Sequence, residues 1–307
     1  MSDETSQART EPGSAPGSGV VRELVRATRP RQWSKNLLVF AAPLLSGRFT
    51  EAAVLADAAV AFVAFTLAAS GIYLVNDVRD VESDRAHPTK RLRPVAAGSL
   101  GARTAARAGA VLAATALLVA LASGLDLVAV IAIYLTLSLL YCFVLKDEPV
   151  IDIAIIAAGF LLRAIAGGAA AGIELSQWFL LAASFGSLFM AAGKRYAEIL
   201  LVARGGPALR ASLASYSPSY LRFVWTVSAG LLIMTYGLWA FELGEEAGGN
   251  WWYVASMAPF VLAVLRYALD VDRGSAEEPE ELALGDRMLE VFALCWLMMV
   301  AVAVYST

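Results

Sequence analysis

Long apolar stretches follow one another along most of this 307-residue chain. Several of them exceed the roughly 20 residues that a helix needs to cross a membrane. The mean hydropathy is +0.64, and 17% of the residues are charged, whereas soluble domains carry about 25% charged residues. The sequence therefore predicts an all-α integral membrane protein. Because charge is sparse, the few places where polar side chains gather are the candidates for a functional site.

Nine of these stretches are predicted to cross the membrane. With a cytoplasmic N-terminus, every Lys and Arg except Arg48 and Arg163 falls in the N-terminal segment or in loops on the cytoplasmic side, as the positive-inside rule requires. The first stretch is short and contains Pro43, so an interfacial or re-entrant segment is the alternative there. The predicted spans are 33–47, 52–75, 103–122, 125–145, 150–172, 176–193, 221–243, 250–269 and 287–305.

The same topology divides the chain and orients it. Residues 1–28 are expected to be a disordered cytoplasmic tail, because the start of the chain is rich in Ser, Gly, Pro and charge. Residues 29–307 are expected to form a single nine-helix membrane catalytic domain. Three long polar loops, at 76–102, 194–220 and 267–286, all fall on the cytoplasmic side. We therefore expect a multi-pass protein of the plasma membrane whose N-terminus and active-site loops face the cytoplasm.

The first of these loops begins with a dense polar motif, NDVRDVESDRAHPTKRLRP, at residues 76–94. If the second span continues as a helix, Asn76, Asp77, Asp80 and Asp84 fall within an arc of about 100°. Carboxylates crowded on one face repel one another unless a cation neutralises them. Hard oxygen ligands suit Mg²⁺, which completes its shell with water and phosphate oxygens. The motif predicts a catalytic Mg²⁺ site with Asp77, Asp80 and Asp84 as ligands.

Cations follow the carboxylates directly, at Lys90, Arg91 and Arg93. Guanidinium and ammonium groups beside a metal would suit a Mg²⁺-bound diphosphate. The ordinary interpretation is that these cations serve only to fix the topology of a solvated loop. The third long loop, 267–286, is rich in Asp and Glu and is expected to be a solvated acidic loop.

Two further polar clusters lie at span ends, and one charge lies within a span. GKRYAEI contributes Lys194, Arg195, Tyr196 and Glu198, with Lys194 and Arg195 four and three residues before Glu198, and RPRQWSKNLL contributes Gln32, Lys35 and Asn36 at the same helical spacings. The first is interpreted as a second phosphate or metal wall, with a surface ion pair as the alternative. The second is interpreted as a phosphate-binding helix start, with a membrane anchor as the alternative. Arg163 falls inside an apolar stretch, where charge is costly and usually lines a cavity.

The motif NDVRDVESD after a second span, followed by KRLRP, resembles the NDxxDxxxD signature of the UbiA-type membrane prenyltransferase superfamily. The resemblance covers essentially the whole chain and implies nine helices around an intramembrane cavity that binds a Mg²⁺-diphosphate substrate. GKRYAEI stands where prenyl-transferring members carry a second aspartate-rich motif. This departure, with RPRQWSKNLLVFAAPLL and RYALDVD…EELALGDR, is similar to the decaprenyl-phosphate phosphoribosyltransferase branch.

That branch implies a pentosyltransferase of actinobacterial cell-wall synthesis. Its members move 5-phosphoribose from phosphoribosyl diphosphate to a polyprenyl phosphate lipid, for the arabinose of arabinogalactan. The expected partners are these two substrates and the membrane, with no nucleic acid. One alternative is a UbiA-type enzyme that moves a polyprenyl group onto an aromatic acceptor. The other is a cation-coupled transporter, whose carboxylates would be expected near the bilayer midplane rather than at a helix end.

Overall fold

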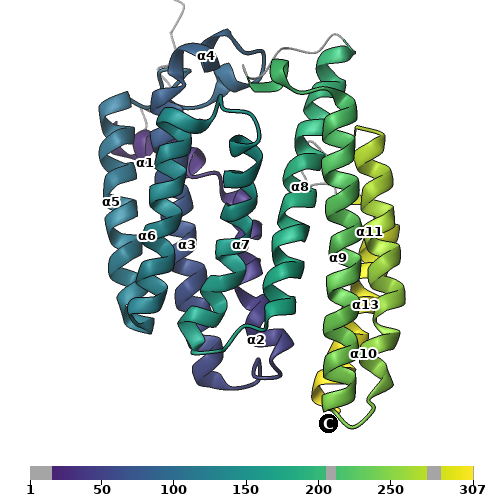
Figure 1. The fold of residues 1–307 in the computed structure, drawn as a ribbon. Helices are drawn as coiled ribbons and strands as arrows, with labels where there is room; N and C mark the ends of the chain where they lie inside the picture. Colours follow the sequence, from purple (N-terminus) through teal and green to yellow (C-terminus); the bar gives the residue numbers. More distant parts are fainter. Residues whose placement is uncertain (1–15, 205–211, 275–284, 307) are drawn as a thin grey trace, which may run out of the picture.

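The computed structural model describes residues 16–204, 212–274 and 285–306 (Figure 1). These described residues are helical or in loops and form no strand. The long helices run side by side as one bundle, and the short α4 lies across one end of it (Figure 1). The elements in chain order are α1 (Pro16–Ala27), η1 (Pro30–Phe40), α2 (Ala41–Leu45), α3 (Ala52–Arg79), α4 (Val81–Ala86), η2 (Lys90–Leu92), α5 (Ala102–Ala120), η3 (Leu121–Ser123), α6 (Leu125–Leu140), η4 (Tyr141–Leu145), α7 (Ile151–Ala171), α8 (Gln177–Ala203), η5 (Ser212–Ser215), α9 (Pro218–Glu246), α10 (Trp251–Ala255), α11 (Met257–Asp272) and α13 (Arg287–Tyr305).

Seven segments of the described chain are long and apolar enough to cross a membrane. They match seven of the nine predicted spans, and the predicted count of nine is not confirmed. The helix α8 has 27 residues and packs between α7 and α9, but it is not among the seven. The seven are Ala52–Arg79, Ala102–Ser123, Leu125–Leu145, Ile151–Ala171, Pro218–Glu246, Trp251–Asp272 and Arg287–Tyr305.

The first predicted span differs most from expectation, because η1 is a 3₁₀ helix of 11 residues followed by the short α2. A 3₁₀ helix rises about 2 Å per residue, so η1 and α2 together extend roughly 30 Å, close to the thickness of the hydrocarbon core. The segment runs along the bundle from the end near α1 to the opposite end (Figure 1). It packs so closely on α7 that a Cβ at Gly167 would meet the carbonyl oxygen of Val39 at 1.8 Å.

The 3₁₀ geometry also changes which side chains share a face. Residues three apart eclipse in a 3₁₀ helix, so Gln32 and Lys35 align and hydrogen-bond to each other. Asn36, which we predicted on the same face, is turned away from them and is buried with Val39. The α-helical spacing assumed from the sequence was therefore wrong for Asn36.

The bundle has two main hydrophobic cores, and α7 contributes to both. The first core joins α3, α5, α6 and the apolar face of η1, while the second joins α8, α9, α11 and α13. Small residues allow close packing within the first core, since Gly71 of α3 lies against the backbone of α5 at Gly109. The space between the two cores, beside α7, is where the candidate site lies.

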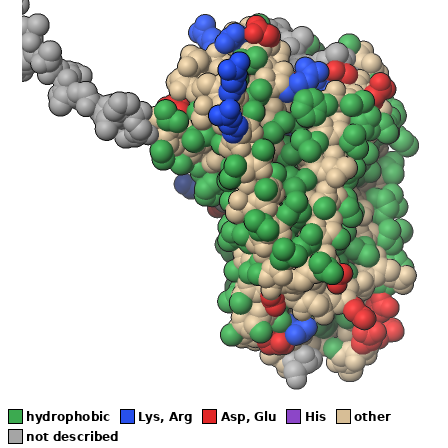
Figure 2. All heavy atoms as spheres, turned by 90° about the vertical axis from the view of Figure 1, so that its left-hand side faces the viewer, with side chains coloured by type: hydrophobic (Ala, Val, Ile, Leu, Met, Phe, Trp, Pro, Cys, Tyr) green, Lys and Arg blue, Asp and Glu red, His purple; other side chains and the backbone are tan. Residues whose placement is uncertain are grey.

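One end of the bundle is polar. The carboxyl ends of α3, α8 and α11 and the amino end of α9 meet there, beside α4 (Figure 1). Lys and Arg side chains gather at this end, whereas apolar side chains cover the middle of the molecule (Figure 2). Part of the predicted disordered tail 1–28 is folded here: α1 packs Leu24 and Ala27 into a small core with Leu74, Val95 and Leu100. Residues 1–15 lie outside the described residues.

Candidate functional site

The carboxylate motif begins in the last turn of α3 and ends in α4. Asn76 and Asp77 belong to α3, Asp80 caps its carboxyl end, and Asp84 lies in α4. The backbone N–H of Asp80 donates to Asn76 O, and that of Asp84 donates to Asp80 O, so helical spacing persists across the break. The break itself is at Asp80, whose φ of −97° and ψ of 11° leave the helical region. The continuous helix that we predicted through Asp84 is therefore interrupted at Asp80.

The break divides the three aspartates between two sets of partners. Asp77 Oδ1 and Asp84 Oδ2 both accept from the same atom, Arg93 Nη1, at 3.3 and 2.6 Å. Asp80 Oδ1 lies 2.6 Å from Lys146 Nζ instead. Among the described residues, no three acidic, His or Cys side chains lie close enough together to form a metal-binding cluster. Two buried carboxylates thus converge on one cation, and the third is held apart by another.

Arg29 also binds Asp77 Oδ1 and was missed as a site residue. Its guanidinium lies over the Tyr73 ring, 4.7 Å from the centroid. Its backbone has a φ of +54°, in the left-handed region that non-glycine residues rarely adopt. Strained residues of this kind occur at functional sites when the surrounding structure holds them in place. The sequence offered only a basic residue beside Pro30, which we had counted as a topological signal.

The predicted cationic run places its members differently. Arg93 contacts two of the carboxylates, as described above. Arg91 is exposed, and Lys90 is half-buried beside His87, whose Nδ1 accepts from the Lys90 backbone N–H. Arg93 lines a small pocket together with Arg29 and Asp77.

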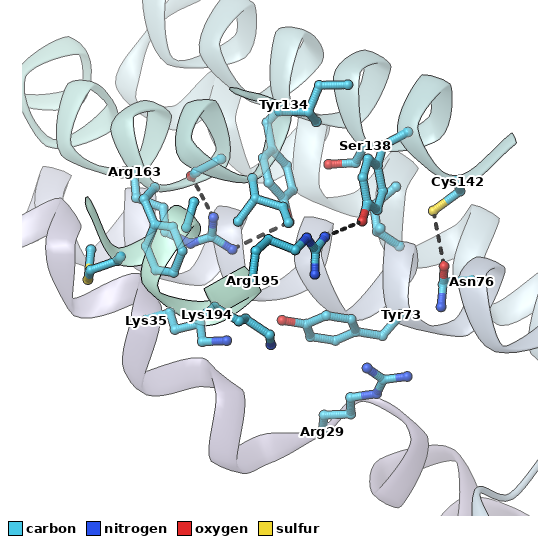
Figure 3. A pocket seen from close by; sticks show the side chains of 18 residues that line it. Arg29, Lys35, Tyr73, Asn76, Tyr134, Ser138, Cys142, Arg163, Lys194 and Arg195 are labelled. Carbon is cyan, nitrogen blue, oxygen red and sulfur yellow. Dashed lines mark hydrogen bonds between the residues drawn. The ribbon is translucent and has the colours of Figure 1, made fainter. Parts of the chain in front are cut away.

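A larger cavity, of about 240 Å³, opens between the two cores (Figure 3). Asn76 lines it together with Tyr73, Tyr134, Tyr141 and Cys142. Its lining also holds a set of cations from η1, α7, α8 and the residue before η1: Arg29, Lys35, Arg163, Lys194 and Arg195. No Asp or Glu is among the described residues that line it. A concave surface lined by charges of one sign concentrates ligands of the opposite sign, so the cavity suits a polyanion.

Arg163 lines this cavity from α7 and is buried. Its Nε donates to Asn36 Oδ1 at 2.8 Å, and its Nη1 donates to Gly159 O at 2.6 Å. The rings of Phe65 and Tyr134 lie against its guanidinium. Asn36 is fixed in turn by donating to Thr66 Oγ1. Asn36 therefore supports Arg163 from behind.

Arg195, labelled in Figure 3 among the residues that line the cavity, is buried completely and has several partners. Its Nε donates to Asp152 Oδ2 at 2.8 Å, its Nη1 to Glu198 Oε2 at 2.7 Å, and its Nη2 to the Tyr141 hydroxyl at 3.2 Å. Two carboxylates balance its charge, so Arg195 supports the wall of the cavity more than it offers free charge to a ligand. Lys194, the neighbouring residue, lines the same wall.

The other two predicted residues of this segment do not line the cavity. Glu198 lies behind Arg195 and binds it, and Tyr196 faces the second core, where its hydroxyl accepts from Arg222. Asp152 completes the cluster and was missed. Its signal was the same as that of Arg163, a single charge within an apolar stretch.

An apolar cavity of about 530 Å³ adjoins the cation-lined cavity. Both cavities are lined by Lys35, Phe160 and Met190, so Lys35 lies where the cation-lined cavity meets the apolar one. From there the apolar lining follows η1 and α2 down the bundle, with Trp296 and Leu297 of α13 on the other side. This shape suits a ligand with an anionic head and a long apolar tail.

Comparison with known proteins places the chain in a family. The model of the UbiA prenyltransferase family matches residues 37–292. Decaprenyl-phosphate phosphoribosyltransferase of Mycolicibacterium smegmatis is 52% identical over 306 residues, covering 96% of each chain. The protein of that name from Mycobacterium tuberculosis is 52% identical over 293 residues, covering 94% of this chain and 96% of its own. A UbiA homologue from Archaeoglobus fulgidus, solved with GPP and Mg²⁺, has the same fold, with a TM-score of 0.68, 17% identity, and coverage of 93% of this chain and 100% of its own.

Proposed function

The chain belongs to the UbiA prenyltransferase family, and we propose that within it the protein is a decaprenyl-phosphate phosphoribosyltransferase. It transfers 5-phosphoribose from phosphoribosyl diphosphate to the phosphate of a polyprenyl lipid, at the cytoplasmic face of the cell membrane. The product would serve the synthesis of cell-wall arabinan, including arabinogalactan. The observation that carries the proposal is the near full-length identity of 52% to proteins of that name. The cation-lined cavity and the adjoining apolar one suit both substrates.

The carboxylates at the end of α3 suit a divalent cation. Asp77 and Asp84 are buried, and their oxygens already share one cationic nitrogen, so hard ligands of the right charge converge there. Mg²⁺ needs only one or two carboxylates when phosphate and water complete its shell. Asp77 and Asp84, with Asn76 and Asp80 nearby, would hold Mg²⁺, which supplies positive charge to the departing diphosphate. The Mg²⁺ of the Archaeoglobus fulgidus structure supports a divalent metal in this fold.

The residues of the chain then bind and orient the reactants. Arg93 and Arg29 lie beside the carboxylates, where they would hold diphosphate oxygens, and Lys194 lines the cavity where a 5-phosphate would lie. An oxygen of the lipid phosphate attacks the anomeric carbon of ribose, the bond from that carbon to the diphosphate breaks, and diphosphate leaves with the electron pair. The attacking phosphate is already ionised, so the reaction needs no general base. His87, the single histidine, does not line the cavity.

Lys35 would hold the acceptor. Its ammonium is positioned by Gln32 at the junction of the two cavities, so a lipid phosphate bound there lies beside the donor while its tail follows η1 and α2. Among the described residues, the acids near Lys194 are Asp152 and Glu198, and both are engaged with Arg195, so they do not offer a second site for a metal-bound prenyl diphosphate. This arrangement favours phosphoribosyl transfer over prenyl transfer.

The test is an assay in membranes with two separate donors. Labelled phosphoribosyl diphosphate with polyprenyl phosphate should yield a labelled lipid and free diphosphate. A polyprenyl diphosphate offered with an aromatic acceptor should yield no product. Prenyl transfer without phosphoribosyl transfer would overturn the proposal and favour the aromatic prenyltransferase instead.

A further inference from the structure

The connector between η4 and α7, residues 146–150, contacts residues at both of its ends. Its first residue, Lys146, reaches the aspartate motif at Asp80, with Nζ 2.6 Å from Oδ1. Its last residue, Val150, contacts Tyr216, in the segment that leads into α9. The π-helical η4 precedes it and carries Tyr141, which binds Arg195, and Cys142, which contacts Asn76. The connector therefore links the carboxylate motif to the Arg195 cluster.

Val150 has a strained backbone. Its φ is +70°, and Val150 is one of two non-glycine residues with positive φ in the described chain. A β-branched residue in this region is an outlier, and such a conformation persists only where surrounding contacts hold it. The contact here is the backbone N–H of Val150, which donates to the Tyr216 hydroxyl. Without that acceptor, the connector would lose the contact that favours its present shape.

Tyr216 is itself firmly anchored. Its side chain is buried and stacks on Tyr220, with ring centroids 5.8 Å apart. Its hydroxyl donates to Asp152 Oδ1, and Asp152 Oδ2 accepts from Arg195 at 2.8 Å. Asp152 and Arg195 are both fully buried. The hydroxyl that holds Val150 is thus fixed by the most enclosed ion pair of the site.

We infer that Tyr216 is a positioning residue that acts through the 146–150 connector to hold Lys146 against Asp80. The Lys146 ammonium and a divalent cation compete for the same carboxylate oxygens, since both are attracted by the charge of Asp80. Lys146 would leave Asp80 when metal and diphosphate bind, and its ammonium would then be available to pair with the charge of the diphosphate. The inference rests on the proposed function for the identity of that diphosphate.

Direct Mn²⁺ binding without substrate, followed by electron paramagnetic resonance on the purified full-length chain, tests the inference. Lys146→Met should tighten Mn²⁺ binding by about threefold, the size of effect expected of a partly exposed ion pair whose side chains are 25% and 19% exposed. Tyr216→Phe keeps the stacked ring and removes the hydroxyl, so it should tighten binding by a smaller factor. The double variant should bind no more tightly than Lys146→Met alone, because both changes act on one contact. Tyr220→Phe, in the stacked neighbour, is the matched control and should leave the affinity unchanged.

Testing Tyr216→Phe in a chain that also carries Val150→Gly separates the positioning role of Tyr216 from general damage to the fold. Glycine adopts positive φ without strain, so a connector with Val150→Gly no longer needs Tyr216 to keep its shape. In the Val150→Gly background, Tyr216→Phe should therefore leave Mn²⁺ affinity at the wild-type value. Weaker Mn²⁺ binding in Tyr216→Phe, effects that multiply in the double variant, or an undiminished effect in the glycine background would each overturn the inference. Failure of phosphoribosyl transfer in the wild type would instead overturn the proposed function, because Mn²⁺ binding is measured without it.

Discussion

Two groups of charged side chains each contribute an arginine to the lining of the same cavity, Arg29 from one and Arg195 from the other, and they are built differently. At the end of α3, the carboxylates of Asp77 and Asp84 are 1% and 4% exposed, but their partners Arg29 and Arg93 are 27% and 25% exposed. In the Arg195 cluster, Arg195 and Asp152 are both 0% exposed. The first group pairs buried acids with cations that reach in from solvent-facing loops. The second encloses the cation as well.

The difference indicates which group can exchange partners. Arg29 and Arg93 come from loops, so they would be able to turn toward a phosphate if a metal replaced them at the carboxylates. Arg195 has no such freedom, because removing any partner would leave a buried charge uncompensated, which is strongly destabilising. The α3 motif is therefore suited to binding and release, and the α8 cluster is suited to holding the wall of the cavity in shape.

The largest effect should come from breaking the enclosed group. Arg195→Met would leave Asp152 and Glu198 buried without their cation, at a cost of about 3–5 kcal/mol. Thermal unfolding in detergent should show a large loss of stability along with lost activity. Arg204→Ala, at the exposed end of the same helix, should change neither. If Arg195→Met unfolds like the wild type and only raises the KM for the donor, then Arg195 is a phosphate ligand and the contrast fails.

Substitutions in the α3 carboxylates should lower activity without lowering stability. Asp77→Asn and Asp84→Asn should each lower turnover by about tenfold or more, because each removes a hard oxygen ligand, while the variants unfold near the wild-type temperature. Asp80→Asn should behave similarly. EDTA should abolish activity and Mg²⁺ should restore it. Full activity in EDTA would contradict the metal site.

Much of this contrast could not be predicted from the sequence. The place of the aspartate motif at the end of the second span could be, because the apolar length of that span marks where it ends, but the break at Asp80 that separates the aspartates could not. Arg29, Lys146, Asp152 and Tyr216 could not, because their partners lie 43 to 66 residues away in the chain. Pairing across such distances is decided by how the helices pack.

The parts of the fold that depend on contacts between distant residues could not be predicted from the sequence either. Seven spans followed from apolar length alone. The 3₁₀ form of η1 did not, because the sequence does not show that its backbone packs against Gly167 of α7. That error put Asn36 on the wrong face, whereas in the structure Asn36 is buried and accepts from Arg163 Nε.

A smaller effect should separate the two substrates. Lys35→Ala should raise the KM for polyprenyl phosphate by about tenfold, as expected for a lost charge-assisted hydrogen bond, and the KM for phosphoribosyl diphosphate by much less. Arg91→Ala, an exposed cation that lines no described pocket, is the control and should alter neither constant. Equal changes in both constants for Lys35→Ala would contradict the assignment of Lys35 to the acceptor.

The smallest effect should come from an ion pair at the polar end that borders neither cavity. Asp286 caps α13 by accepting from the backbone N–H groups of Met288 and Leu289, and it pairs with Arg266. The Arg266 guanidinium, together with these N–H groups, lowers the pKa of Asp286 to about 2. The folded state therefore binds fewer protons than the unfolded state below the ordinary pKa of about 3.9, so the stabilisation is present at neutral pH and is lost as the pH falls toward 2.

Asp286→Asn should lower the unfolding temperature slightly at pH 7, by less than Arg195→Met, and the difference from the wild type should shrink as the medium approaches pH 3. Turnover at pH 7 should change by less than about twofold, since surface changes away from a site have small effects. A large loss of turnover at pH 7 with unchanged unfolding would instead assign Asp286 to the site, and the acidic loop would then have to be counted with the α3 motif.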